Sequence, residues 1–166
     1  MKLKHETEDA LSHIKSAFRY ESGSLYRLCN SGPSKVGDMA GYLHHTGYWY
    51  VKVLSRNHAA HRVIWALCNG RWPEAHIDHI NLDKSDNRIE NLREATTSEN
   101  MMNKAVTRVN TTGFKGVDYS KRHKQFRARI KKGGVSRQIG YFATAEEASL
   151  AYQAAAATTF GAFAHQ

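Results

Sequence analysis

The stretch HIDHINLDKSDNRIENLREATTSENMMNK, residues 76–104, decides the fold of this chain. It is crowded with acidic, amide and imidazole side chains. A short apolar run ends in Asp78 and His79, and a loop rich in turn-forming residues separates this pair from Asn91. The pattern predicts a strand, a loop, a short second strand and then a helix.

The helix is expected to follow Thr97, because a threonine oxygen can accept a backbone N–H at a helix start. Asn100 comes one turn later. Regular alternation would put Asp78 and His79 on opposite faces of the first strand, so the strand must end or twist there. With that change, one carboxylate, one imidazole and the amide of Asn100 can reach a common point.

A calcium-binding loop and a zinc site are two other metal sites that this stretch could form. The loop at residues 81–92 has no glycine at the sixth place of a calcium-binding loop, and Leu92 stands where the closing glutamate belongs. His76 and His79 could chelate zinc, but two further ligands are not obvious nearby. The calcium loop is rejected, and zinc is the weaker reading.

The same residues carry a resemblance to a known family. Over roughly 60–104 the chain resembles the His-Asn-Asn branch of the HNH nucleases, the ββα-metal finger of phage and intron-encoded endonucleases. The family's Asp-His pair matches Asp78 and His79, its central asparagine matches Asn91 twelve residues later, and its last metal ligand matches Asn100 nine residues further on. The flanking strings IDHIN, DNRIENLR and SENMMN agree as well.

The resemblance implies hydrolysis of phosphodiester bonds with one divalent ion, Mg²⁺ or alternatively Mn²⁺. His79 would take a proton from water, Asp78 and Asn100 would hold the ion, and Asn91 would fix the backbone around His79. Three weaker candidates for phosphate contacts are Arg93, Asn103 and Lys104. Structural or phosphate-facing roles are expected for His61 and His76, and turn chemistry alone accounts for Asn87.

Size and composition bound the possibilities. With 166 residues, 18.7 kDa and 41% hydrophobic residues, the chain has room for one ordinary domain or two small ones, which excludes a large enzyme fold. Two cysteines are too few for a disulfide framework, so the reducing cytoplasm is the expected location. If a phage encodes the chain, this is the cytoplasm of the bacterial host. No apolar run suits a membrane span, and a monomer with no evident protein partner is expected.

The basic charge is concentrated in one region. The net charge is +9, and residues 109–143 hold nine lysines and arginines against one acid. A dense basic patch in a folded segment favours a polyanion such as nucleic acid. A merely solvated surface is the alternative.

The residues before the central stretch predict further elements. Residues 8–19 have helical spacing, residues 24–55 read as a small meander of strands with a turn at Thr46–Gly47, and residues 60–69 form a helix that Gly70 ends. In that helix Val63, Ile64, Leu67 and Cys68 share an apolar face. The meander is rich in aromatic residues that suit packing or, less commonly, base stacking: Tyr42, Tyr48, Trp49 and Tyr50.

The residues after the central stretch predict a small sheet and a helix. Three strands are expected at 114–120, 125–131 and 135–142, followed by a helix over 144–160 with a capping box at Thr144 and Glu147. In the middle strand QFRARIK, apolar and basic residues alternate strictly. One face should pack on the helix, with Ala148, Ala151, Tyr152 and Ala155 as the helical face, and the other should be cationic.

Residues 112–164 resemble the AP2 DNA-binding domain of plant transcription factors, which is also found appended to phage nucleases. The resemblance rests on the strings GFKGV, IGYFATAEEASLAY and FGAFA. Asp118, Ser120 and Gln138 depart from the plant pattern, so DNA binding carries over more safely than a sequence preference. The expected DNA-binding residues of this region are Lys115, Arg127, Arg129 and Lys131.

Together these readings predict an α+β protein. Residues 1–108 would form a nuclease domain with an N-terminal β meander and a ββα-metal finger, residues 109–113 a linker, and residues 114–166 a three-stranded antiparallel sheet packed on one helix. The predicted function is a Mg²⁺-dependent endonuclease of double-stranded DNA. The alternatives are a DNA-binding protein with a silent finger and, with less weight, an RNA-directed protein.

Overall fold

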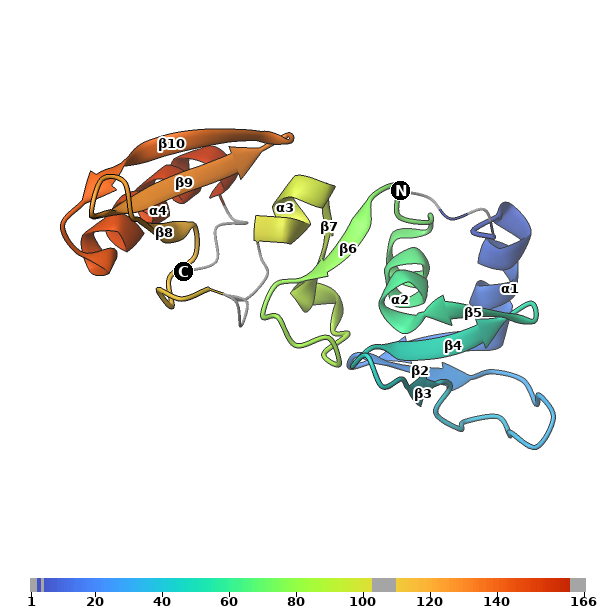
Figure 1. The fold of residues 1–166 in the computed structure, drawn as a ribbon. Coiled ribbons are helices and arrows are strands. Elements are labelled where there is room, and N and C mark those ends of the chain that lie inside the picture. Colours follow the sequence, from blue (N-terminus) through green and yellow to red (C-terminus); the bar gives the residue numbers. More distant parts are fainter. Residues whose placement is uncertain (1–2, 4, 103–109, 162–166) are drawn as a thin grey trace. The chain divides into compact units, whose positions relative to one another are not determined.

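The computed structural model describes residues 3, 5–102 and 110–161 of the chain. The chain splits into two compact units, residues 1–95 and 96–166, each of which is described by itself (Figure 1). Several small antiparallel sheets accompany the helices, in agreement with the predicted α+β class. The linker at 109–113 stays a prediction.

The first unit combines three small sheets with two α-helices. Its elements are α1 (Glu8–Ala17), β1 (Phe18–Glu21), β2 (Ser24–Arg27), β3 (Tyr42–Leu43), β4 (Trp49–Val53), β5 (Arg56–Ala59), α2 (Ala60–Asn69), β6 (His76–His79), the 3-10 turn η1 (Ile89–Asn91) and β7 (Leu92–Ala95). β1 pairs with β2, β3, β4 and β5 form one sheet, and β6 pairs with β7. The single meander predicted over 24–55 is therefore wrong, because β2 pairs with β1 and not with β3.

The helix predicted over 8–19 is shorter than expected. Thr7 caps α1 by accepting the Ala10 N–H, but Phe18 is already extended, so β1 begins where the helix ends. β1 and β2 are joined by Ser22 and Gly23, which both have positive φ, 47° and 87°. Two left-handed residues in a two-residue loop match the right-handed twist of a hairpin.

One strand of the β3–β4–β5 sheet was missed and one turn was predicted correctly. The β4–β5 turn consists of Leu54 and Ser55, with φ of 45° and 66°, and neither residue type announces a left-handed turn. The β3–β4 turn does lie at the predicted Thr46–Gly47, where the Gly47 N–H donates to the His44 carbonyl.

α2 has the predicted bounds and ends at Gly70, which is left-handed with φ of 70°. Val63 and Ile64 are fully buried in the core of the first unit, but Cys68 is exposed. The buried face of α2 is instead completed by Ala60 and Ala66. Small residues allow the neighbouring strands to approach this face closely.

The second unit is a three-stranded antiparallel sheet with one long helix and one short helix. Its elements are α3 (Thr97–Met102), β8 (Val117–Ser120), β9 (Gln125–Lys132), β10 (Val135–Phe142) and α4 (Ala145–Phe160). The strand order is β10-β9-β8. The predicted capping box of α4 is confirmed at Thr144 and Glu147.

The core of the second unit lies between β9 and α4. Ala128 and Ile130 are buried together with Ala148 and Tyr152, as the alternation of QFRARIK predicted. The strand predicted from residue 114 begins only at Val117. Gly116 has φ of 70°, and a Cβ there would lie 2.2 Å from the Tyr152 ring, so the close approach of α4 requires a glycine.

A buried ion pair joins the N-terminal segment to α2 in the first unit. Glu6 is 1% exposed and Arg62 is 7% exposed. Two Glu6 oxygens accept from the Arg62 guanidinium, and the second of these bonds measures 2.8 Å. Arg62 also donates to the carbonyls of Pro73 and Ala75, so this pair fixes the segment that leads into β6.

We expect Glu6→Ala to destabilise the first unit by about 3 to 5 kcal/mol, because it leaves the buried Arg62 charge without its partner. Urea unfolding followed by tryptophan fluorescence measures this, since Trp49, Trp65 and Trp72 all lie in the first unit. The matched control is Glu21→Ala, which removes the partner of the exposed Arg19 and should cost at most about 1 kcal/mol. Equal effects of the two variants would contradict the prediction.

Candidate active site

The end of β6 buries three consecutive residues, so both faces of the strand are covered there. Ile77, Asp78 and His79 are each at most 7% exposed. The pairing with β7 stops here, because the Leu82 N–H donates to the His79 carbonyl and Leu82 is left-handed with φ of 67°. The strand therefore ends at His79, which is one of the two alternatives that the sequence left open, and the convergence of Asp78 and His79 on one point stays a prediction.

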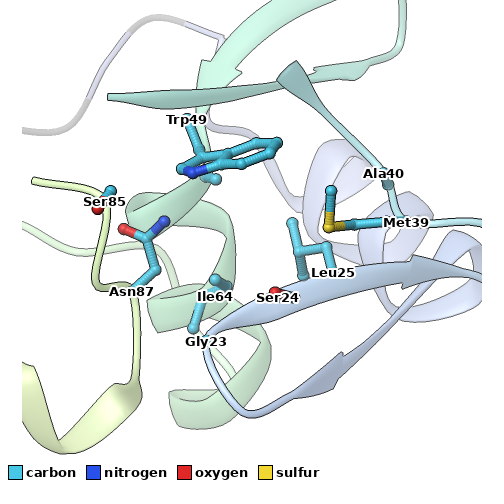
Figure 2. A pocket seen from close by; sticks show the side chains of 10 residues that line it. Gly23, Ser24, Leu25, Met39, Ala40, Trp49, Ile64, Ser85 and Asn87 are labelled. Atoms are coloured by element: carbon cyan, nitrogen blue, oxygen red, sulfur yellow. The ribbon is translucent and has the colours of Figure 1, made fainter. Parts of the chain in front are cut away.

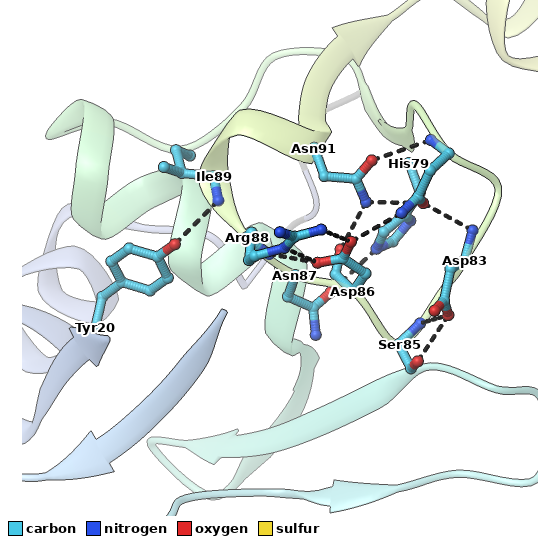
Figure 3. Close-up of polar contacts among 10 residues, drawn as sticks. Tyr20, His79, Asp83, Ser85, Asp86, Asn87, Arg88, Ile89 and Asn91 are labelled. Atoms are coloured by element: carbon cyan, nitrogen blue, oxygen red, sulfur yellow. Dashed lines mark hydrogen bonds and ion pairs between the residues drawn. The ribbon is translucent and has the colours of Figure 1, made fainter. Parts of the chain in front are cut away.

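Asn91 spans the loop that follows β6. Its side-chain oxygen accepts the Asn81 N–H at 3.0 Å, and its amide nitrogen donates to the Asp86 carbonyl at 2.8 Å and to the Asn81 side chain at 3.0 Å (Figure 3). Its backbone carbonyl accepts the Ile80 N–H. The bonds of Asn91 thus hold the two residues that directly follow His79 in the chain.

His79 is held by a residue for which only a turn-forming role was predicted. His79 Nε2 lies 3.0 Å from Asn87 Oδ1, and Asn87 is 3% exposed (Figure 3). Because a carbonyl oxygen only accepts, Nε2 is the donor in this hydrogen bond. The prediction that turn chemistry alone accounts for Asn87 is wrong.

Nothing in the residue type distinguishes Asn87 from the other turn formers of the loop. The signal that could have found it is topological. A loop that returns to pair β7 with β6 must bring its last residues next to the end of β6, where His79 lies. A buried imidazole needs a partner, and Asn87 is a polar residue at that returning end.

The acids of the loop have structural partners. Asp86 accepts from Arg88 and from Asn81, and the Arg88 hydrogen bonds hold the pKa of Asp86 well below its usual range. Asp83 accepts from Ser85, which lowers the pKa of Asp83. In the described parts of the chain, no three His, Cys, Asp or Glu side chains gather as metal ligands would. The hydrogen bonds of Asp83 and Asp86 therefore stabilise the conformation of the loop.

Two rings, those of His61 and Tyr48, lie next to the imidazole of His79. The His61 ring lies edge-on to it at 5.1 Å between centroids, and the Tyr48 ring lies 5.9 Å from His79 and 5.4 Å from His61. Burial, followed by the neighbouring His79, lowers the pKa of His61 to about 3, so His61 is neutral at physiological pH. His76, in contrast, is exposed at the start of β6.

Asp78 forms an ion pair with its cross-strand neighbour Arg93. The Arg93 guanidinium donates to Asp78 Oδ2 at 3.0 Å, and both side chains are largely buried. A carboxylate offers about four lone-pair sites, so accepting from Arg93 is compatible with binding a cation. Carboxylate and amide oxygens are the hard ligands that Mg²⁺ and Mn²⁺ prefer. Asp78 and Asn100 therefore fit such an ion by their chemistry.

Asn100 lies on α3, which belongs to the second unit, so its predicted meeting with Asp78 and His79 stays a prediction. The start of α3 differs from the expectation. Thr96 is the cap, because its side chain accepts the Glu99 N–H while Glu99 accepts the Thr96 N–H. Asn103 and Lys104, two predicted phosphate contacts, lie outside the described residues.

The exposed face of the second sheet is cationic but internally paired. Asp118 on β8 accepts from Arg127 at 2.7 Å and from Arg129 at 3.0 Å on β9. Lys131 is exposed on the same strand, and Lys115 is half-buried, which lowers the pKa of its ammonium. A phosphate that binds this face must therefore compete with the carboxylate of Asp118.

Comparison with known proteins identifies one part of the chain. Residues 58–102 match the family model described as HNH endonuclease, so the chain carries an HNH endonuclease domain there. This span contains β6, the loop, β7 and α3. The matched residues include Asp78, His79, Asn91 and Asn100.

Two viral proteins are similar to the chain. One is "Protein 3.8" of Escherichia phage T7, 33% identical over 75 residues, which are 45% of this chain and 62% of that protein. The other is "Uncharacterized HNH endonuclease L560" of Acanthamoeba polyphaga mimivirus, 33% identical over 106 residues, 63% of this chain and 54% of that protein. The chain thus spans less than two thirds of either relative. No solved structure matches it. No helix among the described residues is long and apolar enough to cross a membrane.

The buried His61 should make the stability of the first unit depend on pH. Its pKa is lowered from 6.5 to about 3 in the folded state, so the unfolded chain binds a proton more readily as pH falls below 6.5. Stability is therefore lost on acidification, by about 2 kcal/mol between pH 7 and pH 5 from this group.

The measurement is urea unfolding at pH 7 and pH 5 for the protein and for His61→Phe. The variant should lose less stability on acidification by about 2 kcal/mol, since Phe cannot take up the proton. His45→Phe, at an exposed position, is the matched control and should keep the pH dependence of the parent. The same dependence in His61→Phe and the parent would rule out the assignment.

Proposed function

We propose that this chain is a divalent-metal-dependent DNA endonuclease that uses His79 as its general base. The observation that carries the proposal is the hydrogen bond between His79 and Asn87. It orients the buried imidazole of His79, the residue that follows Asp78 in the chain, within the residues that match the HNH endonuclease family. Phosphodiester hydrolysis is the reaction that this set of groups serves best.

The chemical step begins with a water molecule near His79. With the proton held on Nε2 by Asn87, His79 accepts the water proton at Nδ1, and the oxygen attacks phosphorus in line with the leaving 3′ oxygen. The imidazolium that results donates from Nε2 to Asn87 Oδ1, which stabilises its charge. Asn91 keeps the backbone after His79 in place, and the rings of His61 and Tyr48 limit the motion of the imidazole.

The cation would be held by Asp78 and Asn100, and Mg²⁺ or Mn²⁺ suits their oxygens. When bound, such an ion stabilises the negative charge that develops on the phosphate and on the leaving oxygen. Asp78 is the charged ligand of this pair, and Arg93 already balances its charge. Affinity for the cation should therefore be weak until DNA adds its phosphate oxygens.

Double-stranded DNA is the proposed substrate, with the second unit as the part that grips it. The AP2-like resemblance and the cationic strand β9 support this division of roles. Phosphate contacts supply affinity that falls steeply with salt, and a tether raises the local concentration of the nuclease on its substrate. The proposed contacts are Arg93, Asn103, Lys104, Lys115, Arg127, Arg129 and Lys131.

A second candidate is a DNA-binding protein whose nuclease finger is silent. The ion pair between Asp78 and Arg93 favours it, because Arg93 occupies part of the carboxylate that a cation needs. A plasmid-nicking assay with Mg²⁺, with Mn²⁺ and with EDTA separates the two. Nicking that requires the metal supports the endonuclease, and its absence with both metals supports the silent finger.

We expect His79→Ala to lower the rate of metal-dependent cleavage by about 10² to 10⁴-fold, because it removes the general base. DNA binding measured by fluorescence anisotropy should stay near that of the parent. His45→Ala is the matched control, since His45 is an exposed histidine of the same unit with no proposed part in the site, and should cleave normally. Cleavage by purified His79→Ala at the parental rate would remove His79 as the base.

The paired arginines of β9 predict two opposite effects on DNA binding. Arg127→Ala with Arg129→Ala should weaken binding and flatten the slope of log K against log salt by about two, since each lost phosphate contact lowers the slope by about one. Asp118→Asn should strengthen binding, because it releases both arginines from their internal partner. An unchanged slope in the double variant would contradict the charged-face model.

A further inference from the structure

A small pocket lies next to the residue that holds His79. Its walls come from β2, from α2, from the start of β4 and from the loop after β6, all within the first unit. Figure 2 shows the Trp49 indole on one side, Met39 and Leu25 on another, and Asn87 facing them. Ile64 of α2 lies between these sides.

Asn87 connects this pocket to the candidate active site. Its side-chain oxygen accepts from His79, but within the described residues its amide nitrogen has no hydrogen-bond acceptor. Figure 2 shows that nitrogen on the side of the Trp49 ring. Asn87 is 3% exposed as a residue, but this nitrogen is not fully shielded from solvent, so a water molecule or a ligand atom in the pocket can accept from it. The pocket therefore suits a ligand that brings an acceptor atom to Asn87.

The lining defines the chemical class of that ligand. None of its side chains is charged, so the pocket does not suit a phosphate or a carboxylate. An indole ring and a thioether are the partners of a flat aromatic ring, and the Trp49 ring and the half-exposed Met39 supply both. Two serines, Ser24 and Ser85, add hydroxyls at the rim. A neutral heteroaromatic ring with hydrogen-bond acceptors meets these chemical conditions, and the pocket volume of about 80 Å³ admits the edge of one such ring.

We infer that this pocket receives an unstacked nucleobase of the DNA substrate, from a nucleotide close to the phosphate that is cut. The inference rests on the proposed function. Stacking against an aromatic side chain and a hydrogen bond to the base edge are the means by which proteins bind an unstacked base. A pocket separated from His79 by one side chain is within reach of a nucleotide whose phosphate lies at His79.

The shared amide of Asn87 gives this pocket a role in specificity. A base that places an acceptor at the Asn87 nitrogen fixes the orientation of the side chain whose oxygen holds His79. A base that presents a donor there leaves the amide unpaired, which costs free energy. The base in the pocket thus favours or disfavours the orientation of His79 that cleavage requires.

The test uses the full-length protein and a DNA duplex whose cleavage position is first mapped from the product ends. 2-Aminopurine, which fluoresces when it is unstacked, replaces one base at a time on either side of the cut. Binding is measured in EDTA, so that no cleavage occurs. We expect a rise in fluorescence at one position only, and in that position base changes should alter the cleavage rate in Mg²⁺.

Variants of the pocket complete the test. Trp49→Ala should remove the fluorescence rise and weaken binding of that duplex by about tenfold, while Trp49→Phe keeps an aromatic ring and should retain most of both. Met39→Ala, at a half-exposed position that the fold tolerates, should lower the rise without changing thermal stability. Tyr42→Ala is the matched control, because Tyr42 is an exposed aromatic residue of the same sheet outside the pocket.

The outcomes distinguish this inference from the proposed function. Two results would overturn the nucleobase pocket but leave the endonuclease proposal standing, provided that metal-dependent cleavage is seen. One is the absence of a fluorescence rise near the cut, and the other is a rise that Trp49→Ala and Met39→Ala both leave intact. Binding of free 2-aminopurine riboside without unstacking in DNA also overturns the nucleobase pocket. Failure to cleave DNA with either metal overturns both. A rise at one position that the pocket variants remove and Tyr42→Ala retains supports the inference.

Discussion

The hydrogen bond between His79 and Asn87 is the contact on which the candidate active site depends. It closes the loop after β6 onto the end of that strand, and it makes Nε2 of His79 the donor to Asn87. Asn91 closes the same loop at a second point through the backbone of Asn81. Two amide side chains therefore close this loop: Asn91 accepts and donates at once, and Asn87 accepts from His79.

Other elements of the first unit hold this loop in place. Tyr20 on β1 accepts the Ile89 N–H and so ties the returning end of the loop to the N-terminal hairpin. The ion pair of Glu6 and Arg62 fixes the segment that enters β6. The segment that enters β6 and the end of the loop before β7 are thus both anchored to elements far away in the sequence.

The sequence predicted the elements whose signals are local. α2 with its terminal glycine, the capping box of α4 and the alternation of β9 follow from spacing and capping chemistry, and the structure confirms them. β5 was missed because its turn uses Leu54 and Ser55 in left-handed conformations. The role of Asn87 was missed because it depends on which residues the returning loop brings together, and no local pattern encodes that. The meeting of Asp78 with Asn100 joins two separate units and stays a prediction.

The pairing of Arg93 with Asp78 has a consequence for how folding would relate to metal binding. In many small metal-binding domains the ion holds the fold together, and removing it unfolds the chain. Here the guanidinium already supplies the positive charge that the buried carboxylate requires. If Asp78 holds the cation, as we propose, folding of the first unit would therefore come before metal binding and would not depend on it.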